Sequence, residues 1–195
     1  DETCANNLLC RAEVKGQLEV FVMSECPFGI KALNAMEEIL AAFGDEIQFS
    51  VHFIGDEQDG KPTSMHGQGE VDEDIRELCA MQEFPQDYMK YILCRNKNIR
   101  DTNWQACATD GVDAAVIEEC FKGEGEKLLI EDMKIAKALG VSGSPTWIAD
   151  GRHKFSGIDA ATVQKNICQH NPELNGCKTP FKAAERGGPA PSCKQ

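Results

Sequence analysis

The first part of the chain shows a strand pattern, a helix pattern and a second strand pattern in succession. Residues 17–23 alternate polar and apolar side chains before turning fully apolar, which predicts a buried strand. Residues 30–43 carry apolar side chains at helical spacing, with Ser24 as a candidate N-cap and Gly44 at the end. Residues 47–54 largely alternate and predict a second strand. This order predicts a parallel strand–helix–strand unit with a right-handed crossover.

The middle of the chain predicts a group of helices. After a polar stretch at residues 55–69, which we interpret as a loop, helical spacing returns in four segments. These segments are residues 72–81, 86–94, 114–121 and 127–139. Together they predict one helical insertion of about 70 residues, without internal repeats.

The last part of the chain predicts a hairpin, a helix and a tail. Residues 145–149 form a short β-like run, and residues 153–155 return after a turn. Residues 160–168 have helical spacing and predict a closing helix. Residues 179–195 are rich in Pro, Gly and Lys, as tails are, yet they carry Cys193.

Composition and charge narrow the class of protein. The 195 residues include 32 acidic and 20 basic side chains, for a net charge of -12, and 42% are hydrophobic. This predicts one globular domain with a core of useful size. The acidic balance argues against nucleic acid and anionic membrane surfaces as partners. No apolar run approaches the roughly 18 residues that a membrane span needs.

Ten cysteines are the most informative feature of the composition. None of them forms a C-x2-C pair, so a zinc site is disfavoured and we expect no metal. Pairing of sequence neighbours predicts the disulfides Cys4/Cys10, Cys79/Cys94, Cys107/Cys120 and Cys168/Cys177, and we expect at least three bridges among these eight. That pairing leaves Cys26 and Cys193 over.

So many disulfides indicate an oxidising compartment: periplasmic, secreted or lumenal. The chain starts with the polar Asp1-Glu2-Thr3 and shows no signal peptide, so we expect a mature form whose signal has been removed.

Cys26 lies where the first strand meets the first helix. Unpaired N–H groups and the helix dipole favour a thiolate over a thiol in a first helical turn, and Pro27 suits that turn. The thiolate is the nucleophile of disulfide exchange. The alternative is that Cys26 is a small core residue or one half of a structural bridge.

This arrangement, with Ser144-Pro145-Thr146 before the hairpin, resembles the thioredoxin fold. More narrowly it resembles the DsbA-type oxidoreductases and the gamma-interferon-inducible lysosomal thiol reductases, over about residues 17–170. The resemblance implies an α/β fold with an inserted helical subdomain at about 70–140. It also implies an N-terminal extension at 1–16 and a C-terminal tail at 171–195.

The resemblance also implies a site. Cys26 would be the nucleophile, and a cis Ser144–Pro145 peptide bond would face it at a distance of about 8 Å or less. The substrate chain would bind as an added strand in a groove lined by Pro27, Phe28, Gly29, Ser144 and Pro145. The implied partners are protein or peptide thiols and disulfides, with no cofactor beyond an external low-molecular-weight thiol.

One departure from the family pattern is that C-x-x-C is here Cys26-Pro27-Phe28-Gly29. Without a second cysteine, Cys26 cannot resolve a mixed disulfide within that motif. Four options remain: monothiol exchange with an external thiol, disulfide isomerisation, a resolving cysteine from elsewhere, or a binding module that has lost catalysis. Position 29 lies one helical turn after Cys26, so a Gly29→Cys substitution is expected to restore the pair without destabilising the fold.

Two further features have simple interpretations. Met65-His66 is expected to belong to an ordinary surface loop rather than a copper site. The acidic run Asp72-Glu73-Asp74 is expected to be charge placed at a helix N-terminus.

Overall fold

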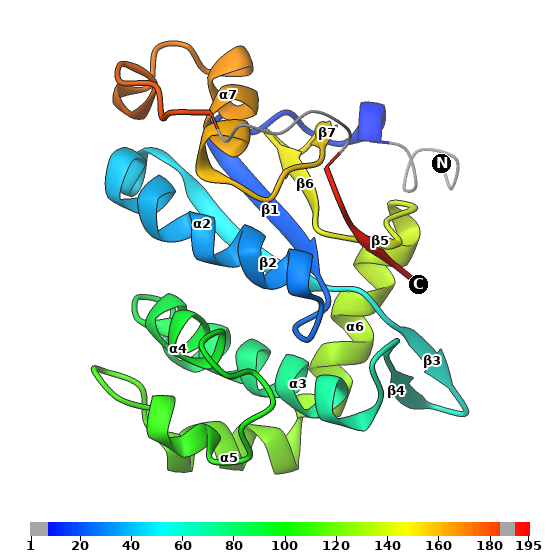
Figure 1. The fold of residues 1–195 in the computed structure, drawn as a ribbon. Helices are drawn as coiled ribbons and strands as arrows, with labels where there is room; N and C mark the ends of the chain where they lie inside the picture. Colours follow the sequence, from blue (N-terminus) through cyan, green and yellow to red (C-terminus); the bar gives the residue numbers. More distant parts are fainter. Residues whose placement is uncertain (1–7, 184–189) are drawn as a thin grey trace.

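The computed structural model, which describes residues 8–183 and 190–195, contains a four-stranded sheet in the order β2-β1-β6-β7 (Figure 1). Strands β1 (Gln17–Val22) and β2 (Gln48–Phe53) are parallel, as the sequence predicts, and helix α2 (Pro27–Phe43) connects them. Strands β6 (Thr146–Ala149) and β7 (His153–Phe155) add the antiparallel hairpin.

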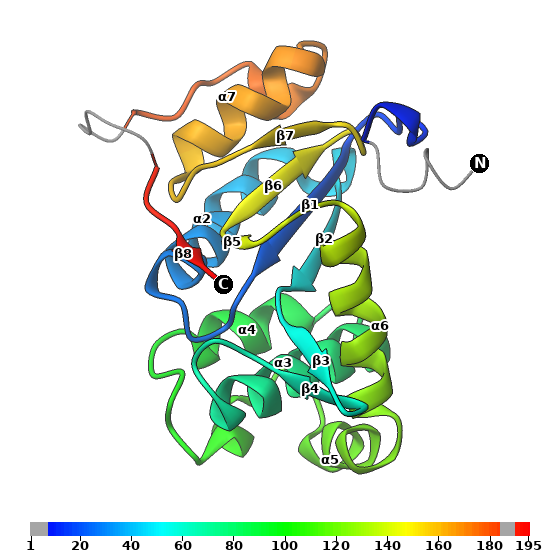
Figure 2. The ribbon, with the colours of Figure 1, turned by 90° about the vertical axis from the view of Figure 1, so that its right-hand side faces the viewer.

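The alternation of strand β1 gives each face of the sheet its own core. Val20 and Val22 belong to the large apolar cluster that contains the buried face of α2. Phe21 points to the opposite face and joins a second cluster with Ala136 of helix α6 (Gly125–Ala138). Helix α7 (Ala160–His170) packs beside α2, so the sheet lies between helices (Figure 2).

The helical insertion lies beyond one end of the sheet (Figure 1). It consists of α3 (Gln68–Glu83), α4 (Tyr88–Arg95) and α5 (Ala114–Gly123), with a 3-10 turn at Trp104–Cys107. Outside the insertion, 3-10 turns lie at Leu8–Cys10, Gly44–Glu46 and Asn175–Cys177. The prediction of an α/β fold of the thioredoxin type with inserted helices is confirmed. The division of the chain at residues 16 and 170 stays a prediction.

The disulfides of the insertion differ from the predicted pairing. Cys79 bonds to Cys120 and Cys94 bonds to Cys107, so the pairs Cys79/Cys94 and Cys107/Cys120 are wrong. The reason is that α3 packs against α5, which brings cysteines together that are 41 residues apart in sequence. Cys168–Cys177 is as predicted, and the expectation of at least three bridges among the eight cysteines is confirmed. Cys10 is disulfide-bonded, and Cys4 lies outside the described residues.

The sequence pattern did not predict two pairs of short strands. Strands β3 (Asp56–Gln58) and β4 (Lys61–Thr63) pair within the predicted loop at 55–69. Strands β5 (Gly143–Ser144) and β8 (Cys193–Lys194) pair although about 50 residues separate them in the sequence. Strands of two or three residues are too short to show an alternation. None of the helices in the described part of the chain is long and apolar enough to cross a membrane.

Candidate functional site

Cys26 is the N-cap residue of helix α2 and has an extended backbone, with φ −71° and ψ 121°. The expected N-cap, Ser24, is therefore wrong by two residues: Cys26 O accepts the first helical hydrogen bond, from Ile30 N at 2.9 Å. Pro27 occupies the first helical position, where its missing N–H costs nothing. Helix α2 therefore begins directly after Cys26, so this cysteine lies at the positive end of the helix dipole, where the sequence places it.

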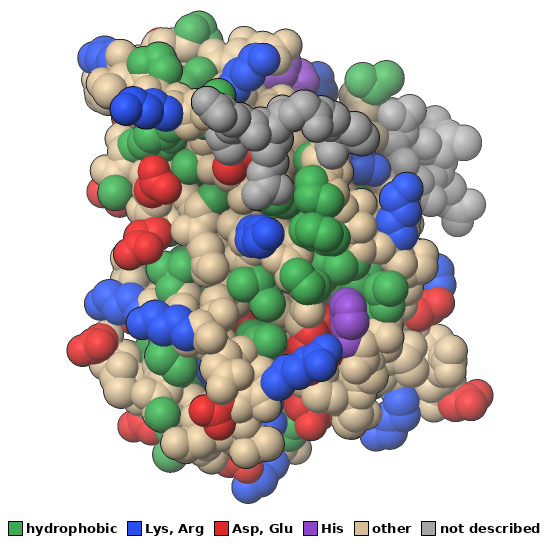
Figure 3. All heavy atoms as spheres, in the orientation of Figure 1, with side chains coloured by type: hydrophobic (Ala, Val, Ile, Leu, Met, Phe, Trp, Pro, Cys, Tyr) green, Lys and Arg blue, Asp and Glu red, His purple; other side chains and the backbone are tan. Residues whose placement is uncertain are grey.

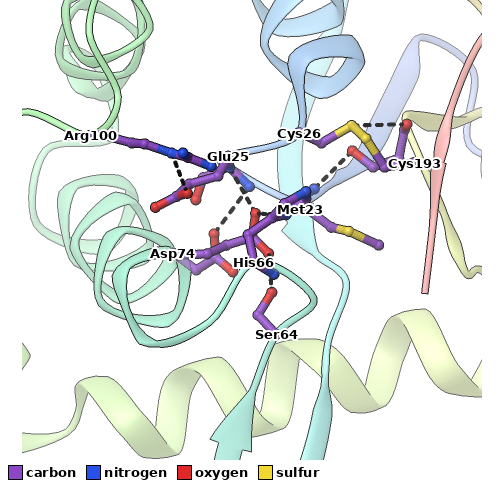
Figure 4. Close-up of polar contacts among 11 residues, drawn as sticks. Met23, Glu25, Cys26, Ser64, His66, Asp74, Arg100 and Cys193 are labelled. Atoms are coloured by element: carbon purple, nitrogen blue, oxygen red, sulfur yellow. Dashed lines mark hydrogen bonds and ion pairs between the residues drawn. A yellow bond between two sulfur atoms is a disulfide. The ribbon is translucent and has the colours of Figure 1, made fainter.

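The Cys26 sulfur is bonded to Cys193, and the two Cα atoms lie 6.2 Å apart (Figure 4). Cys26 has no exposed surface, whereas Cys193 keeps part of its surface. The pairing of sequence neighbours gave neither Cys26 nor Cys193 a partner. The second sulfur beside Cys26 therefore comes from the end of the chain rather than from position 29.

The Ser144–Pro145 peptide bond is cis, as predicted, and lies next to this disulfide. Cys26 Sγ is 3.5 Å from Ser144 O, so the expected proximity is met. Ser144 also fixes the preceding turn, because its Oγ accepts a hydrogen bond from Met23 N at 2.9 Å. The structure thus brings together Cys26, Ser144 and Pro145 as the resemblance implied, while their roles in binding a substrate stay predictions.

Gly29 is buried in α2 and has no room for a side chain. A Cβ atom there would lie 2.6 Å from Ser144 Oγ and 3.0 Å from Met23 O. The expectation that cysteine fits at position 29 without destabilising the fold is wrong. Phe28 is half-buried and packs on the apolar cluster that also contacts Cys193, whereas Pro27 is exposed.

Acidic side chains of α3 hold the turn that precedes Cys26 (Figure 4). Glu70 accepts hydrogen bonds from Glu25 N at 2.8 Å and from the Ser64 hydroxyl. It is also paired with His66 Nδ1 at 2.7 Å. Asp74 accepts from Ser24 N at 3.3 Å. These contacts connect helix α3 of the insertion to the turn that leads into α2.

The expectations for this region therefore need correction. Glu73 and Asp74 are not exposed charges at a helix N-terminus, because α3 begins at Gln68 and both residues are buried in its second turn. Glu73 is paired with the buried Arg95, at 2.7 Å. His66 lies in a loop, as expected, but its side chain is largely buried against Glu70 rather than free on the surface.

Burial raises the pKa of Asp74 well above its usual range, and the neighbouring charge of Glu70 raises it further. Glu77, one turn further along α3, also has a raised pKa because it is buried. A raised native pKa means that the folded chain binds more protons than the unfolded chain above about pH 4. Stability from these two groups is therefore present at low pH and is lost as the pH rises towards the native pKa.

We expect the urea midpoint to fall between pH 4.5 and pH 7, and an Asp74→Asn substitution to remove part of this fall. The slope from one such group is at most about 1.4 kcal/mol per pH unit. The control is Asp56→Asn, because exposed Asp56 has a lowered pKa, caused mainly by its hydrogen bond with Lys137, and acts only below this window. An Asp74→Asn variant with the parent's pH slope would contradict the prediction.

The sequence and the fold of the chain are similar to those of known proteins. The sequence model of the gamma interferon inducible lysosomal thiol reductase family matches residues 17–111. No curated protein sequence matches the chain. Oxidised BdbD from Bacillus subtilis superposes with a TM-score of 0.61 at 14% identity, over 82% of this chain and 98% of that one.

Two further solved structures have the same architecture. The thiol-disulfide exchange protein alpha-DsbA2 from Wolbachia pipientis gives a TM-score of 0.59 at 14% identity, over 82% of this chain and 83% of that one. A periplasmic thioredoxin-like protein from Salmonella enterica serovar Typhimurium gives 0.53 at 16% identity, over 81% and 86%. The chain therefore has the thioredoxin fold with inserted helices that DsbA-type thiol–disulfide oxidoreductases have, and its residues 17–111 match the gamma interferon inducible lysosomal thiol reductase family.

Proposed function

We propose that the chain is a thiol–disulfide exchange protein in which Cys26 is the nucleophile and Cys193 supplies the second sulfur. The observation that carries this proposal is the Cys26–Cys193 disulfide at the N-terminus of α2, beside Ser144–Pro145. Of the options left by the missing cysteine at position 29, a resolving cysteine from elsewhere is the one that this bridge supports.

In the reducing direction, the Cys26 thiolate attacks one sulfur of a substrate disulfide. A Cys26–substrate disulfide forms, and the other substrate sulfur leaves as a thiolate and takes up a proton. The Cys193 thiolate then attacks Cys26 Sγ, which releases the second substrate thiol and forms Cys26–Cys193. Two electrons have passed to the substrate, and an external thiol returns them to the protein.

In monothiol exchange, an external low-molecular-weight thiol attacks the Cys26–substrate disulfide in place of Cys193. Isomerisation is the case in which another thiol of the substrate does so, with no net electron transfer. Both reactions use the same Cys26 thiolate, and the groove of Pro27, Phe28, Gly29, Ser144 and Pro145 would hold the substrate chain in each.

The proposed partners are exported proteins with thiols or disulfides, met in a periplasmic, secreted or lumenal compartment. Three described bridges besides Cys26–Cys193 support an oxidising location, because such bonds persist where thiols are not kept reduced. The similar proteins agree with this location, since they include a lysosomal family and a periplasmic protein.

A second candidate is a binding or scaffold module in which Cys26 no longer reacts. The observation that favours it is that Cys26 is bridged and has no exposed surface. The two candidates differ in whether the Cys26–Cys193 bond opens in the folded protein.

We expect Cys26–Cys193 to be reduced at least about tenfold faster than Cys79–Cys120 when the folded chain meets glutathione, because exchange depends on access to a sulfur. Cys193 is partly exposed on a two-residue strand, whereas Cys79 and Cys120 are buried between helices. Alkylation with iodoacetamide followed by peptide mass spectrometry measures both rates in one sample. If the two bridges open together, only on unfolding, Cys26–Cys193 is structural and the binding module is the better proposal.

A further inference from the structure

The segment Pro191–Gln195, called here the tail segment, lies along the edge of strand β5 in the position of an added strand (Figure 2). We propose that the tail segment is a tethered substitute for the substrate, which occupies the binding edge beside Cys26 and closes it. The inference rests on the proposed function, and it names both the substrate class and the way the site is regulated.

The backbone pairing of the tail segment is regular. Strand β8 is antiparallel to β5, with Cys193 opposite Ser144 and Lys194 opposite Gly143. The pairing continues one residue further, because Gln195 N donates to Ser142 O at 3.1 Å. In an antiparallel ladder the hydrogen-bonded pairs alternate, so the Cys193–Ser144 pair is also of the hydrogen-bonded kind. The main chain of the cysteine is thus held directly beside the residue that precedes Pro145.

The sulfur atoms have the connectivity of a reaction intermediate. A substrate caught in mid-reaction would have one cysteine bonded to Cys26 and its backbone along an exposed strand edge. Cys193 has both features at once. A substrate strand and the tail segment cannot occupy the edge of β5 together, so the bridged form is closed to protein substrates.

The contacts of the tail segment indicate what kind of substrate the edge accepts. Lys194 and Gln195 are exposed, and a Cβ atom on Gly143 would meet Ser192 only at ordinary contact distance. After Cys193 the tail is therefore held by its main chain alone, whereas Pro191 and Ser192 before it are half-buried. Cys193 itself packs with Phe28 on the second apolar cluster. Figure 3 shows apolar side chains gathered along the course of β8 on this face. The fitting substrate class is an extended segment with a cysteine, with little dependence on the side chains that follow the cysteine.

The site opens by reduction with a small thiol. A thiolate of the glutathione class attacks the partly exposed Cys193, forms a mixed disulfide there and releases Cys26 as a thiolate. A second small thiol attacks that mixed disulfide and leaves Cys193 as a thiol, with the oxidised small disulfide as the other product. The tail segment is then held only by backbone pairing, which a substrate strand can replace.

The test uses the full chain carrying Cys193→Ser and a peptide with the sequence of residues 190–195, Ala-Pro-Ser-Cys-Lys-Gln. The peptide cysteine is activated as a disulfide with thionitrobenzoate, so attack by Cys26 joins the peptide to the protein and releases the coloured thiolate. The control peptide has N-methyl groups on its cysteine and glutamine amides, which removes both donors to β5. We expect the unmodified peptide to react about tenfold faster, as the loss of two backbone hydrogen bonds implies.

A second pair of variants tests whether the tail segment itself competes for the edge. In the Cys193→Ser background, Gln195→Pro removes the N–H that donates to Ser142, whereas Gln195→Ala keeps it. We expect Gln195→Pro to speed capture of the peptide about threefold, since one weak backbone hydrogen bond is lost. Gln195→Ala should leave the rate unchanged.

The small disulfide 5,5′-dithiobis(2-nitrobenzoate) reports the reactivity of Cys26 without any strand pairing. It therefore distinguishes a failure of the substitute-substrate inference from a failure of the proposed function. If the Cys193→Ser variant folds poorly, each measurement is repeated on the parent chain, which is first reduced with glutathione and then separated from it. If Cys26 reacts with the small disulfide but equally fast with both peptides, the substitute-substrate inference is overturned and the proposed function stands. If folded Cys26 reacts with none of the three, both are overturned.

Discussion

Replacing Cys26 with serine is expected to lower the rate of insulin-disulfide reduction by about 100-fold or more, because a serine hydroxyl forms no thiolate to attack a disulfide. The measurement is insulin turbidity in the presence of dithiothreitol, with the uncatalysed rate subtracted. The loss should also appear with glutathione as the reductant, since no other described cysteine lies at the first turn of α2.

Two control variants give this experiment its meaning. Cys193→Ser should keep a substantial part of the rate when an external thiol is plentiful, because that thiol can resolve the Cys26–substrate disulfide. Cys168→Ser breaks a bridge near α7 and should change stability rather than turnover. A Cys26→Ser variant that reduces insulin as fast as the parent would contradict the assignment of Cys26 as nucleophile.

Adding a side chain at Gly29 is expected to destabilise the fold by about 2–4 kcal/mol, through overpacking and loss of the Ser144 hydrogen bond. A Cβ atom would press against Ser144 Oγ at 2.6 Å and against the backbone oxygen of Met23 at 3.0 Å. For a chain of this length, the melting temperature should fall by about 4–16 °C. Gly29→Ala is the variant to measure by thermal unfolding, because it adds the Cβ atom without a new thiol.

Gly123 provides the matched control for Gly29. It also lies in a helix, but a Cβ atom there would meet no atom within 4 Å. Gly123→Ala should therefore be neutral or stabilise the chain by up to about 1 kcal/mol, from helix propensity alone. Equal melting temperatures for the two variants would mean that the contact with Ser144 is not tight. The expected difference implies that this site excludes a second cysteine at position 29 on steric grounds.

The sheet and its helices could be predicted because their patterns are long. Strand β1 and helix α2 each present an apolar face over many residues, and the parallel pairing of β1 with β2 follows from their order. Strand β8 has two residues and no such pattern, so its pairing with β5 depends on tertiary structure alone. The disulfide partners were mistaken for the same reason, because helix packing, not sequence distance, brings Cys79 to Cys120.

The candidate site could be predicted where it is local in sequence. Cys26 at the start of a helix and the Ser144-Pro145 pair are visible in the residues themselves. Glu70 and Asp74 were missed, because acidic residues on a helix are usually exposed and these two are buried. One signal was present: residues 70, 74 and 77 lie at helical spacing, on the face of α3 that also carries buried apolar side chains.

The Cys26–Cys193 bond also ties the chain into its largest described covalent loop, with a separation of 167 residues. Closing a loop of this length removes enough freedom from the unfolded chain to stabilise the folded one by about 5 kcal/mol. The bridge at Cys94–Cys107, with a separation of 13, contributes about 3 kcal/mol in the same way. Opening the site for exchange therefore withdraws the strongest covalent restraint on unfolding. The protein is most resistant to heat and proteases while it is idle, and least resistant while it is ready to react.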